Sequence, residues 1–403
     1  MNRQNSFAIQ IAIIVSFGGF IFGLDAALIS GTLKSLIQQF SLSDLEVGTV
    51  VSAPGFGVIF ALLVTGYVCD ALGRKNALLI IAFLYLGSCM AATFAPSFHT
   101  LVAARFIGGL AFSSLSVAAM YIGEVAPPHA RGKLVAVNQL NIVVGLLAAY
   151  FVNYLLVKLS AMDLPIVHSL GIQTHLWRWM LGMQIVPSFI WFLLLFLVPE
   201  SPRWLLLRGR TEEAKVVIKK TLSEADQEEF WREFHEISSV DERSISLRAQ
   251  LKAFFDKHLR LALIVGFTVA ILQPITGINA ILFYAPNVFE QVGIGSDQAF
   301  LQSAVMGLIS VAFTALALVL IDRIGRRTLL LVGLIWAVVS LGMCAWSFGE
   351  AKYVLTDQNV ATLSQKFDST GLQKIVGHTY TSDVAFKRAV ADNVGSQVAR
   401  EHE

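Results

Sequence analysis

Charged residues are scarce in this sequence of 403 residues, of which Asp, Glu, Lys and Arg make up 14%. A soluble domain typically carries about 25%, so the chain has little of the charged surface that an ordinary globular protein presents to water. The formal net charge is only +2, which gives no indication of a nucleic acid or an acidic partner. Composition therefore favours a membrane protein.

Cysteine is also rare, and its placement argues against two kinds of site. Cys69, Cys89 and Cys344 each lie within or at the end of an apolar run, which predicts small hydrophobic side chains and neither a disulfide framework nor a metal site. The sequence shows no nucleophile–base set, phosphate-binding loop or metal-ligand spacing. We therefore expect no enzyme activity, no cofactor and no metal.

What the sequence has in quantity is long apolar runs. A helix needs about 20 predominantly apolar residues to cross the hydrocarbon core of a bilayer. A hydropathy walk predicts nine such spans, near residues 8–31, 46–69, 76–95, 99–124, 134–157, 179–199, 260–289, 299–321 and 328–348. The expected fold class is an all-α membrane protein.

Basic residues gather in alternate loops and so predict the orientation. The loops rich in them carry Arg74, Lys75, Arg131, Lys133, Arg323, Arg326 and Arg327. Because basic loops stay in the cytoplasm, we expect a multi-pass protein of the cell membrane (plasma or bacterial inner membrane) with a cytoplasmic N-terminus. The expected parts are a six-helix bundle (1–199), a cytoplasmic linker with short helices (200–258), three helices of a second bundle (259–348) and a polar extracytoplasmic tail (349–403).

The linker carries two patterns typical of helix starts. Thr211 precedes Glu212 and Glu213, and Ser223 precedes Glu224 and Asp226. A hydroxyl at the N-cap followed by acidic residues in the first turn stabilises a helix N-terminus. We therefore predict one helix N-cap at Thr211 and another at Ser223.

One phrase, D-x-x-G-R-[KR], occurs at residues 70–75 and again at 322–327. The copies follow the second and the eighth predicted span, so they indicate a six-span repeat. Parallel repeats of this kind build transporters that hold substrate between two halves. Gly permits a sharp turn, and the acid can bond the basic residues or cap a helix end. The loops could be simple topology anchors or an inner gate latch.

Further motifs resemble those of the sugar porter family of the major facilitator superfamily, over residues 10–350. They are the D-x-x-G-R-[KR] loops, Gly18–Asp25, Arg105–Gly109, Glu124–Pro127, Arg131–Lys133, Gln139–Gly145, Pro199–Leu205 and Gln273–Tyr284. The resemblance implies a major facilitator fold and uptake of a monosaccharide, a hexose or a pentose, by alternating access. Within the family the chain is similar to bacterial proton-linked xylose and hexose symporters.

Asp25 lies in the middle of the first predicted span. A charge at that depth costs at least about 2.5–3.5 kcal/mol on insertion scales, which makes it a candidate functional residue. Arg105, within the fourth span, is its candidate partner. The resemblance implies that Asp25 and Arg105 couple a proton to transport, because proton-linked members keep Asp here. The alternative is a static pair that holds two helices together.

Sugar hydroxyls require both donors and acceptors, which Gln and Asn amides supply from one group. Gln139, Gln273 and Asn279 meet this need, and the resemblance implies that these positions hold the sugar. Phe22 and Tyr284 could add apolar contact with the sugar face or form an outer gate. Packing or interhelical hydrogen bonding is the alternative role for the three amides, and aromatic residues are common in these spans in any case.

Charged residues at the inner ends of the spans form a third candidate set. Glu124 with Arg131, and Glu200 with Arg203, mark the inner ends of the fourth and sixth spans. The resemblance implies that they join the two loops in a charge network that locks the outward-facing state; a solvated interface is the alternative. The loop members are Asp70, Gly73, Arg74, Asp322 and Arg326.

Three departures from the family pattern limit what the resemblance implies. Pro274 replaces a second amide after Gln273, and Pro should kink the helix; Ser310 stands where xylose-type members have Asn. After Phe348 no apolar run of spanning length follows, so a chain cut short after the ninth span is expected. A facilitative uniporter, a non-transporting sugar sensor and an inactive fragment are the alternatives to a symporter.

Overall fold

The computed structural model describes residues 3–127, 129–238, 259–291, 295–350, 352–357, 360, 370–380 and 383–394. The chain divides into two compact units, Met1–Leu318 and Val319–Glu403. Within the described residues nine helical stretches are long and apolar enough to cross a membrane, in agreement with the predicted spans. They are Ser6–Phe40, Asp44–Leu72, Arg74–Thr93, Phe98–Val125, Arg131–Ser160, Leu176–Leu195, Arg260–Phe283, Gln298–Ile321 and Arg326–Ser347.

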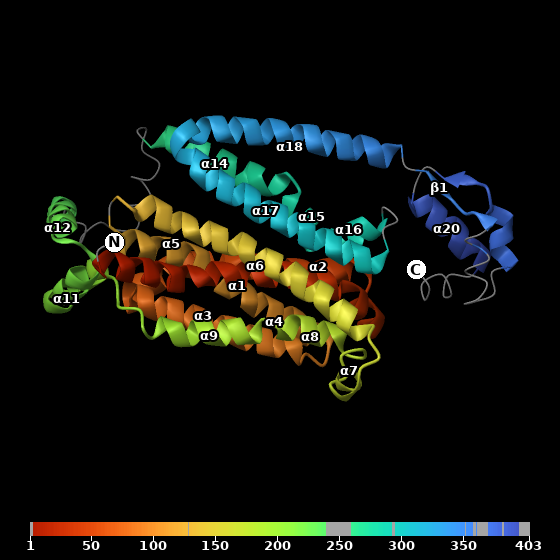
Figure 1. Ribbon diagram of the computed structural model, residues 1–403, viewed down its shortest axis with the longest axis horizontal. Coiled ribbons are helices and arrows are strands. Elements are labelled where there is room, and N and C mark those ends of the chain that lie inside the picture. The colour runs from red at the N-terminus through yellow and green to blue at the C-terminus, as the bar shows by residue number, and fades with distance from the viewer. Residues whose placement is uncertain are drawn as a thin grey trace. The chain divides into compact units, whose positions relative to one another are not determined.

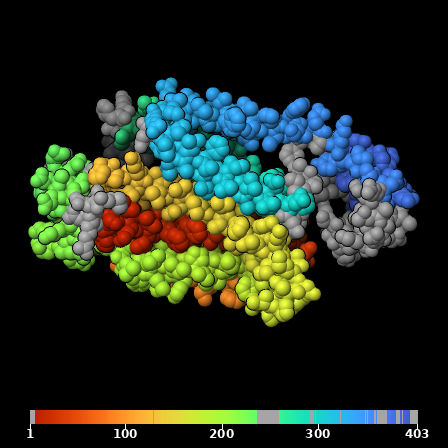
Figure 2. Space-filling view, in the orientation of Figure 1, coloured from red at the N-terminus to blue at the C-terminus, as the bar shows by residue number. Residues whose placement is uncertain are grey.

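Four of the first six spans are single helices: α1 (Arg3–Phe40), α2 (Asp44–Leu72), α3 (Arg74–Thr93) and α6 (Arg131–Ser160). The fourth span is broken into α4 (Phe98–Ala111) and α5 (Ser114–Val125), and the sixth into α8 (Leu176–Gly182) and α9 (Ile185–Leu195); α7 (Pro165–Ser169) lies in the loop between α6 and α8. Helix α1 contacts α5, α6, α8 and α9 and runs through the middle of the bundle (Figure 1). Figure 2 shows α6 in yellow and α8–α9 in yellow-green on either side of red α1.

The contact between α1 and α6 depends on two glycines. A Cβ added to Gly23 would overlap the carbonyl of Ile142, and one added to Gly145 would overlap the carbonyl of Phe20. Lipid tails are as apolar as side chains, so helices in a bilayer associate through close packing and favour small residues where backbones touch. The glycines of the first and fifth span motifs therefore set the spacing between these helices.

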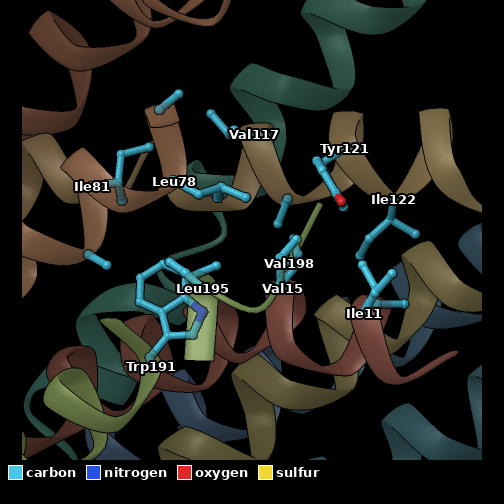
Figure 3. Packing of buried hydrophobic residues seen from close by; sticks show 14 of the residues in the cluster. Ile11, Val15, Leu78, Ile81, Val117, Tyr121, Ile122, Trp191, Leu195 and Val198 are labelled. Atoms are coloured by element: carbon cyan, nitrogen blue, oxygen red, sulfur yellow. The ribbon is translucent and has the colours of Figure 1, made fainter. Parts of the chain in front are cut away.

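Apolar side chains from α1, α3, α5 and α9 meet inside the bundle (Figure 3). Val15, Leu78, Tyr121 and Trp191 are each less than 1% exposed. The Trp191 indole donates to the carbonyl of Ile14 at 2.8 Å, so its one polar atom is satisfied as buried Trp requires. This cluster packs the helices that carry the candidate charged residues.

The seventh span is broken twice, into α14 (Arg260–Ile275), α15 (Ile278–Phe283) and α16 (Ala285–Gln291). The first break follows Pro274 by two residues and places Gly277 in the left-handed region at φ +78°, consistent with the predicted kink. Helices α15 and α16 contact α1, and the Tyr150 hydroxyl donates to the carbonyl of Leu282 at 2.6 Å. The eighth span is α17 (Ser296–Ile324).

Three short helices begin the linker: α10 (Pro202–Leu207), α11 (Thr211–Thr221) and α12 (Glu224–Ser238). The predicted N-cap at Thr211 is wrong, because Thr211 is the first helical residue and the cap position belongs to Arg210. The Arg210 guanidinium hydrogen-bonds Glu213 at 2.6–2.7 Å and lowers the pKa of that carboxyl. At α12 the prediction is confirmed, since the Ser223 hydroxyl accepts from the Asp226 amide at 3.3 Å.

The second unit holds the ninth span, α18 (Arg326–Gly349), and part of the expected polar tail. The tail contains strands β1 (Tyr353–Val354) and β2 (Thr379–Tyr380), paired antiparallel, the 3-10 helix η2 (Thr370–Ile375) and α20 (Asp383–Val394). Its buried cluster consists of Leu355, Val360, Leu372 and Ile375. The described part of the tail therefore has a small apolar core of its own, which its polar composition did not predict.

Candidate functional site

The structure brings Asp25 of α1 and Arg105 of α4 into contact inside the bundle. Arg105 Nη1 donates to Asp25 Oδ1 at 2.7 Å, and the side chains are only 4% and 10% exposed. Removing one member of such a pair is strongly destabilising, because the other charge is left buried and uncompensated. Each charge therefore depends on the other inside the bundle, and the pair ties α1 to α4.

The three candidate sugar-binding amides lie at exposed positions of three helices: Gln139 on α6, Gln273 on α14 and Asn279 on α15. Gln273 also offers its backbone carbonyl, which accepts from the Thr276 hydroxyl at 2.6 Å. Exposure leaves all three side chains accessible to a hydroxylated ligand. Their role in binding sugar stays a prediction.

The two candidate aromatic residues have apolar neighbours. Phe22 packs edge to face against Phe112, with ring centroids 4.6 Å apart. Tyr284, at the end of α15, packs against a buried cluster that includes Ile29 and Leu33 of α1. Phe22 therefore packs against another ring, and Tyr284 lies where the seventh span meets the first.

Arg74 is the centre of the charged group at the other end of the bundle. It is 7% exposed, its Nε lies 3.1–3.2 Å from both carboxylate oxygens of Glu124, and its Nη1 lies 3.3 Å from Asp70 Oδ1 and 3.1 Å from the Cys69 carbonyl. Glu124 also accepts from the Ser201 hydroxyl at 2.5 Å. One guanidinium therefore ties the end of α2 to the end of α5.

Glu200 caps α3. Its Oε1 accepts from the backbone amides of Arg74, Lys75 and Ser201 at 2.9, 3.0 and 2.8 Å. The carboxylate occupies the space that a Cβ on Gly73 would fill, and Gly73 adopts φ +94°. The turn needs glycine for two reasons, its left-handed backbone and the room it leaves for an anion at a helix N-terminus.

Arg131 and Arg203 both approach Glu233 of α12, at 3.6 and 3.9 Å. The sequence places them with Glu124 and Glu200, but the hydrogen bonds of these two carboxylates involve Arg74, Ser201 and backbone amides. Glu233 was not among the predicted residues. The only sequence signal for it is the amphipathic, acid-rich pattern of α12.

The second copy of the loop motif lies in the second unit. Gly325 adopts φ +85°, and Arg326 begins α18 as Arg74 begins α3. Arg326 is exposed. The side chain of Asp322 lies outside what the structure describes, so its role in the gate stays a prediction. The shared positive φ supports the same turn in both copies.

The nine apolar spans of the described residues, the paired charges within the bundle and the repeated turn together indicate a multi-pass membrane transporter of the major facilitator kind. The chain belongs to the family of sugar (and other) transporters, whose model matches residues 11–365.

Proteins similar to this chain include known symporters. It is 35% identical to the arabinose-proton symporter of Bacillus subtilis over 351 residues, which cover 86% of this chain and 72% of that one. It is 32% identical to the D-xylose-proton symporter of Escherichia coli, with 91% and 77% covered. A solved structure of the xylose transporter XylE from E. coli, in a partially occluded inward-open conformation, matches with a TM-score of 0.65 and 31% identity, covering 80% and 75%.

Proposed function

We propose that this protein imports a monosaccharide, a hexose or a pentose, together with a proton by alternating access. The observation that carries the proposal is the Asp25–Arg105 pair, a titratable group held against a cation in the middle of the bundle. Relatives described as proton symporters of arabinose and xylose support the same coupling.

Asp25 has the chemistry required of a proton carrier. Burial favours its neutral form and the neighbouring guanidinium favours its charged form, so a change in water access can shift the balance. A proton that binds Asp25 loosens its attraction to Arg105, and departure of the proton restores that attraction. One proton moving through 100 mV supplies about 2.3 kcal/mol, which corresponds to roughly fiftyfold accumulation of sugar.

Sugar recognition falls in this proposal to Gln139, Gln273 and Asn279, whose amides donate and accept without carrying charge. Phe22 and Tyr284 would border the site with apolar rings. The charged cluster of Arg74, Glu124 and Glu200 would close the cytoplasmic side. Glu233 of α12, which lies near Arg131 and Arg203, would hold this linker helix beside the cluster.

The orientation follows from the basic loops. We infer a cell-membrane location with the N-terminus and the linker in the cytoplasm. Residues 1–199 would form the first half of the transporter and 259–348 the first three helices of the second, with 349–403 on the outside.

Uptake of radiolabelled xylose, arabinose and glucose into proteoliposomes tests the proposal, with an inside-alkaline pH gradient and with an uncoupler. We expect accumulation that the uncoupler and Asp25→Asn both abolish, while sugar counterflow persists in the variant. Asp163→Asn, whose side chain is 97% exposed, serves as the control and should behave like the parent. Uptake that ignores both perturbations would identify a uniporter.

A further inference from the structure

Helix α12 of the linker carries acidic residues on one of its faces. Asp226, Glu229 and Glu233 recur after three and four residues, a spacing that places side chains on the same side of a helix. Figure 1 shows α12 at the end of the bundle where α1 begins. An acidic face at this end lies within reach of the basic residues that begin and follow the spans.

Basic residues from three other parts of the chain meet this face. His129, in the loop between α5 and α6, places its Nδ1 3.3 Å from Asp226 Oδ1. Arg131, the first residue of α6, and Arg203 of α10 place their Nη2 atoms 3.6 and 3.9 Å from Glu233 Oε2. Attraction between opposite charges therefore holds α12 against the inner end of the first bundle.

Asp226 connects this contact to the first turn of α12. Its Oδ2 accepts from the Ser223 hydroxyl at 2.5 Å, and the Ser223 hydroxyl accepts from the Asp226 amide at 3.3 Å. The Asp226 side chain is only 13% exposed. Because one carboxylate both closes the first turn and faces His129, the start of the helix is fixed relative to the loop.

One member of this set of charges can switch near neutral pH. The groups that face His129 and its partner are Arg131 of α6, Arg203 of α10 and the acidic face of α12. Arginine stays charged in proteins, whereas histidine changes its charge between about pH 5 and 8. The Glu233 contacts are longer than hydrogen bonds. The charge on His129 therefore decides how firmly α12 is held: the attraction is present at acid pH and is lost as the pH rises.

We propose that His129 senses the pH of the cytoplasm, and that its protonated form docks α12 and slows opening of the transporter on that side. This inference rests on the proposed function, which brings protons to this end of the bundle. Protons released there charge His129 and fasten α12. The docked helix bridges the start of α6 and α10, which adjoin Glu124 and Glu200 of the cytoplasmic cluster. Import then limits itself when the cytoplasm becomes acidic.

Spin labels measure docking directly. Ala225→Cys on α12 and Gly132→Cys on α6 provide exposed attachment points, and a side chain added at Gly132 meets open space. The exposed Cys344 is replaced by Ser in all variants, whereas Cys69 and Cys89 are buried. An exposed ion pair contributes about 0.2–1 kcal/mol, so acidification from about pH 8 to about pH 5.5 should raise the ratio of docked to separated α12 by about two- to fivefold.

Two substitutions should remove this response. His129→Gln keeps a polar side chain without the titration, and Asp226→Asn keeps an acceptor for Ser223 without the charge. The matched control is His168→Gln, because His168 also pairs with an aspartate, Asp163, at 2.7 Å, but in the loop between α6 and α8. Labels in this control should respond to pH as in the parent.

Sugar counterflow in Asp25→Asn separates the switch from proton coupling, because the proposed carrier is absent. Acid pH inside the vesicles should slow counterflow by about two- to fivefold in this variant, and should have no effect once His129→Gln is added.

A label distance that ignores pH, an equal response in His129→Gln, or counterflow that is indifferent to internal pH overturns the inference. If the labels and counterflow respond as expected but the parent shows no proton-driven uptake, the pH switch stands and the proposed symport fails.

Discussion

The roles of single residues in the charged cluster of Arg74, Glu124 and Glu200 are only partly predictable from their sequence positions. The motif at residues 70–75 predicted an acid that bonds the basic residues or caps a helix, and Asp70 does contact Arg74 at 3.3 Å. The cap itself comes from Glu200, whose partners precede it by more than a hundred residues. Such a contact depends on tertiary packing and leaves no local pattern, so the sequence could indicate that Glu200 matters but not which atoms it serves.

Replacing Glu200 should cost far more than replacing Asp70. Glu200→Ala leaves amides of Arg74 and Lys75 without an acceptor, which should cost about 2 kcal/mol, whereas Glu200→Gln keeps an acceptor and loses about 0.3–1 kcal/mol of charge–dipole attraction. Asp70→Ala removes an exposed carboxylate and should cost at most about 1 kcal/mol. Melting temperatures in detergent measure the order, and an Asp70→Ala effect as large as that of Glu200→Ala would contradict it.

At the scale of helices and turns, apolar length predicted every span in the described chain, yet not the breaks inside them. The break after Pro274 was foreseen because Pro cannot continue the hydrogen-bond ladder. The break between α8 and α9 also has a cause in the sequence, because Pro187 lacks the N–H that would bond the carbonyl of Met183, which lies in the break. The break between α4 and α5 contains neither Pro nor a left-handed residue and depends on how neighbouring helices pack, which periodicity does not report.

The two loop glycines offer a matched comparison. Gly73 and Gly325 share a positive φ, but a Cβ would overlap Glu200 only at Gly73 and would meet open space at Gly325. Gly325→Ala should therefore cost the backbone strain alone, about 1–2 kcal/mol, and Gly73→Ala should cost more because it also displaces the cap. Thermal unfolding of the two variants measures the difference. Equal losses would show that Glu200 moves aside freely.

Lys34 at the end of α1 and Glu290 in α16 form an ion pair at 2.6 Å. Lys34→Glu places like charges together and should push the end of α1 away from the seventh span, and the exchange Lys34→Glu with Glu290→Lys should restore the contact. Spin labels at the exposed residues Gln38 of α1 and Ala280 of the seventh span report the distance. A lengthening that the exchange does not reverse would rule out the pair as its cause.

At the scale of the whole molecule, composition and apolar run length predicted the membrane class and the nine spans found in the described residues, and motif spacing predicts a six-span repeat. The core of the tail was not predicted, because its buried residues are few and lack the regular period of a helix or a strand. The described part of the tail is held together instead by contacts between segments such as η2 and α20. The apolar core of the tail could therefore be recognised only in the structure.

The tail core makes a prediction that concerns the second unit. Leu372 is 0% exposed, and Leu372→Ala should destabilise the tail by about 2–5 kcal/mol through the cavity it leaves. The spanning helices should be unaffected. Hydrogen exchange of the α20 amides, compared with those of α3, measures both effects. Uniform exchange rates in the parent and the variant would mean that this core does not stabilise the tail.

The glycine contacts between α1 and α6 have a mechanical consequence. Where two backbones touch directly, no side chain lies between them whose rotamer could change. The distance between the two helices therefore cannot adjust in small steps. A change in lateral pressure of the bilayer must then be absorbed elsewhere, at side-chain-filled contacts such as that between α3 and α9. We therefore expect the first helix and the fifth span to shift as one unit that carries Asp25.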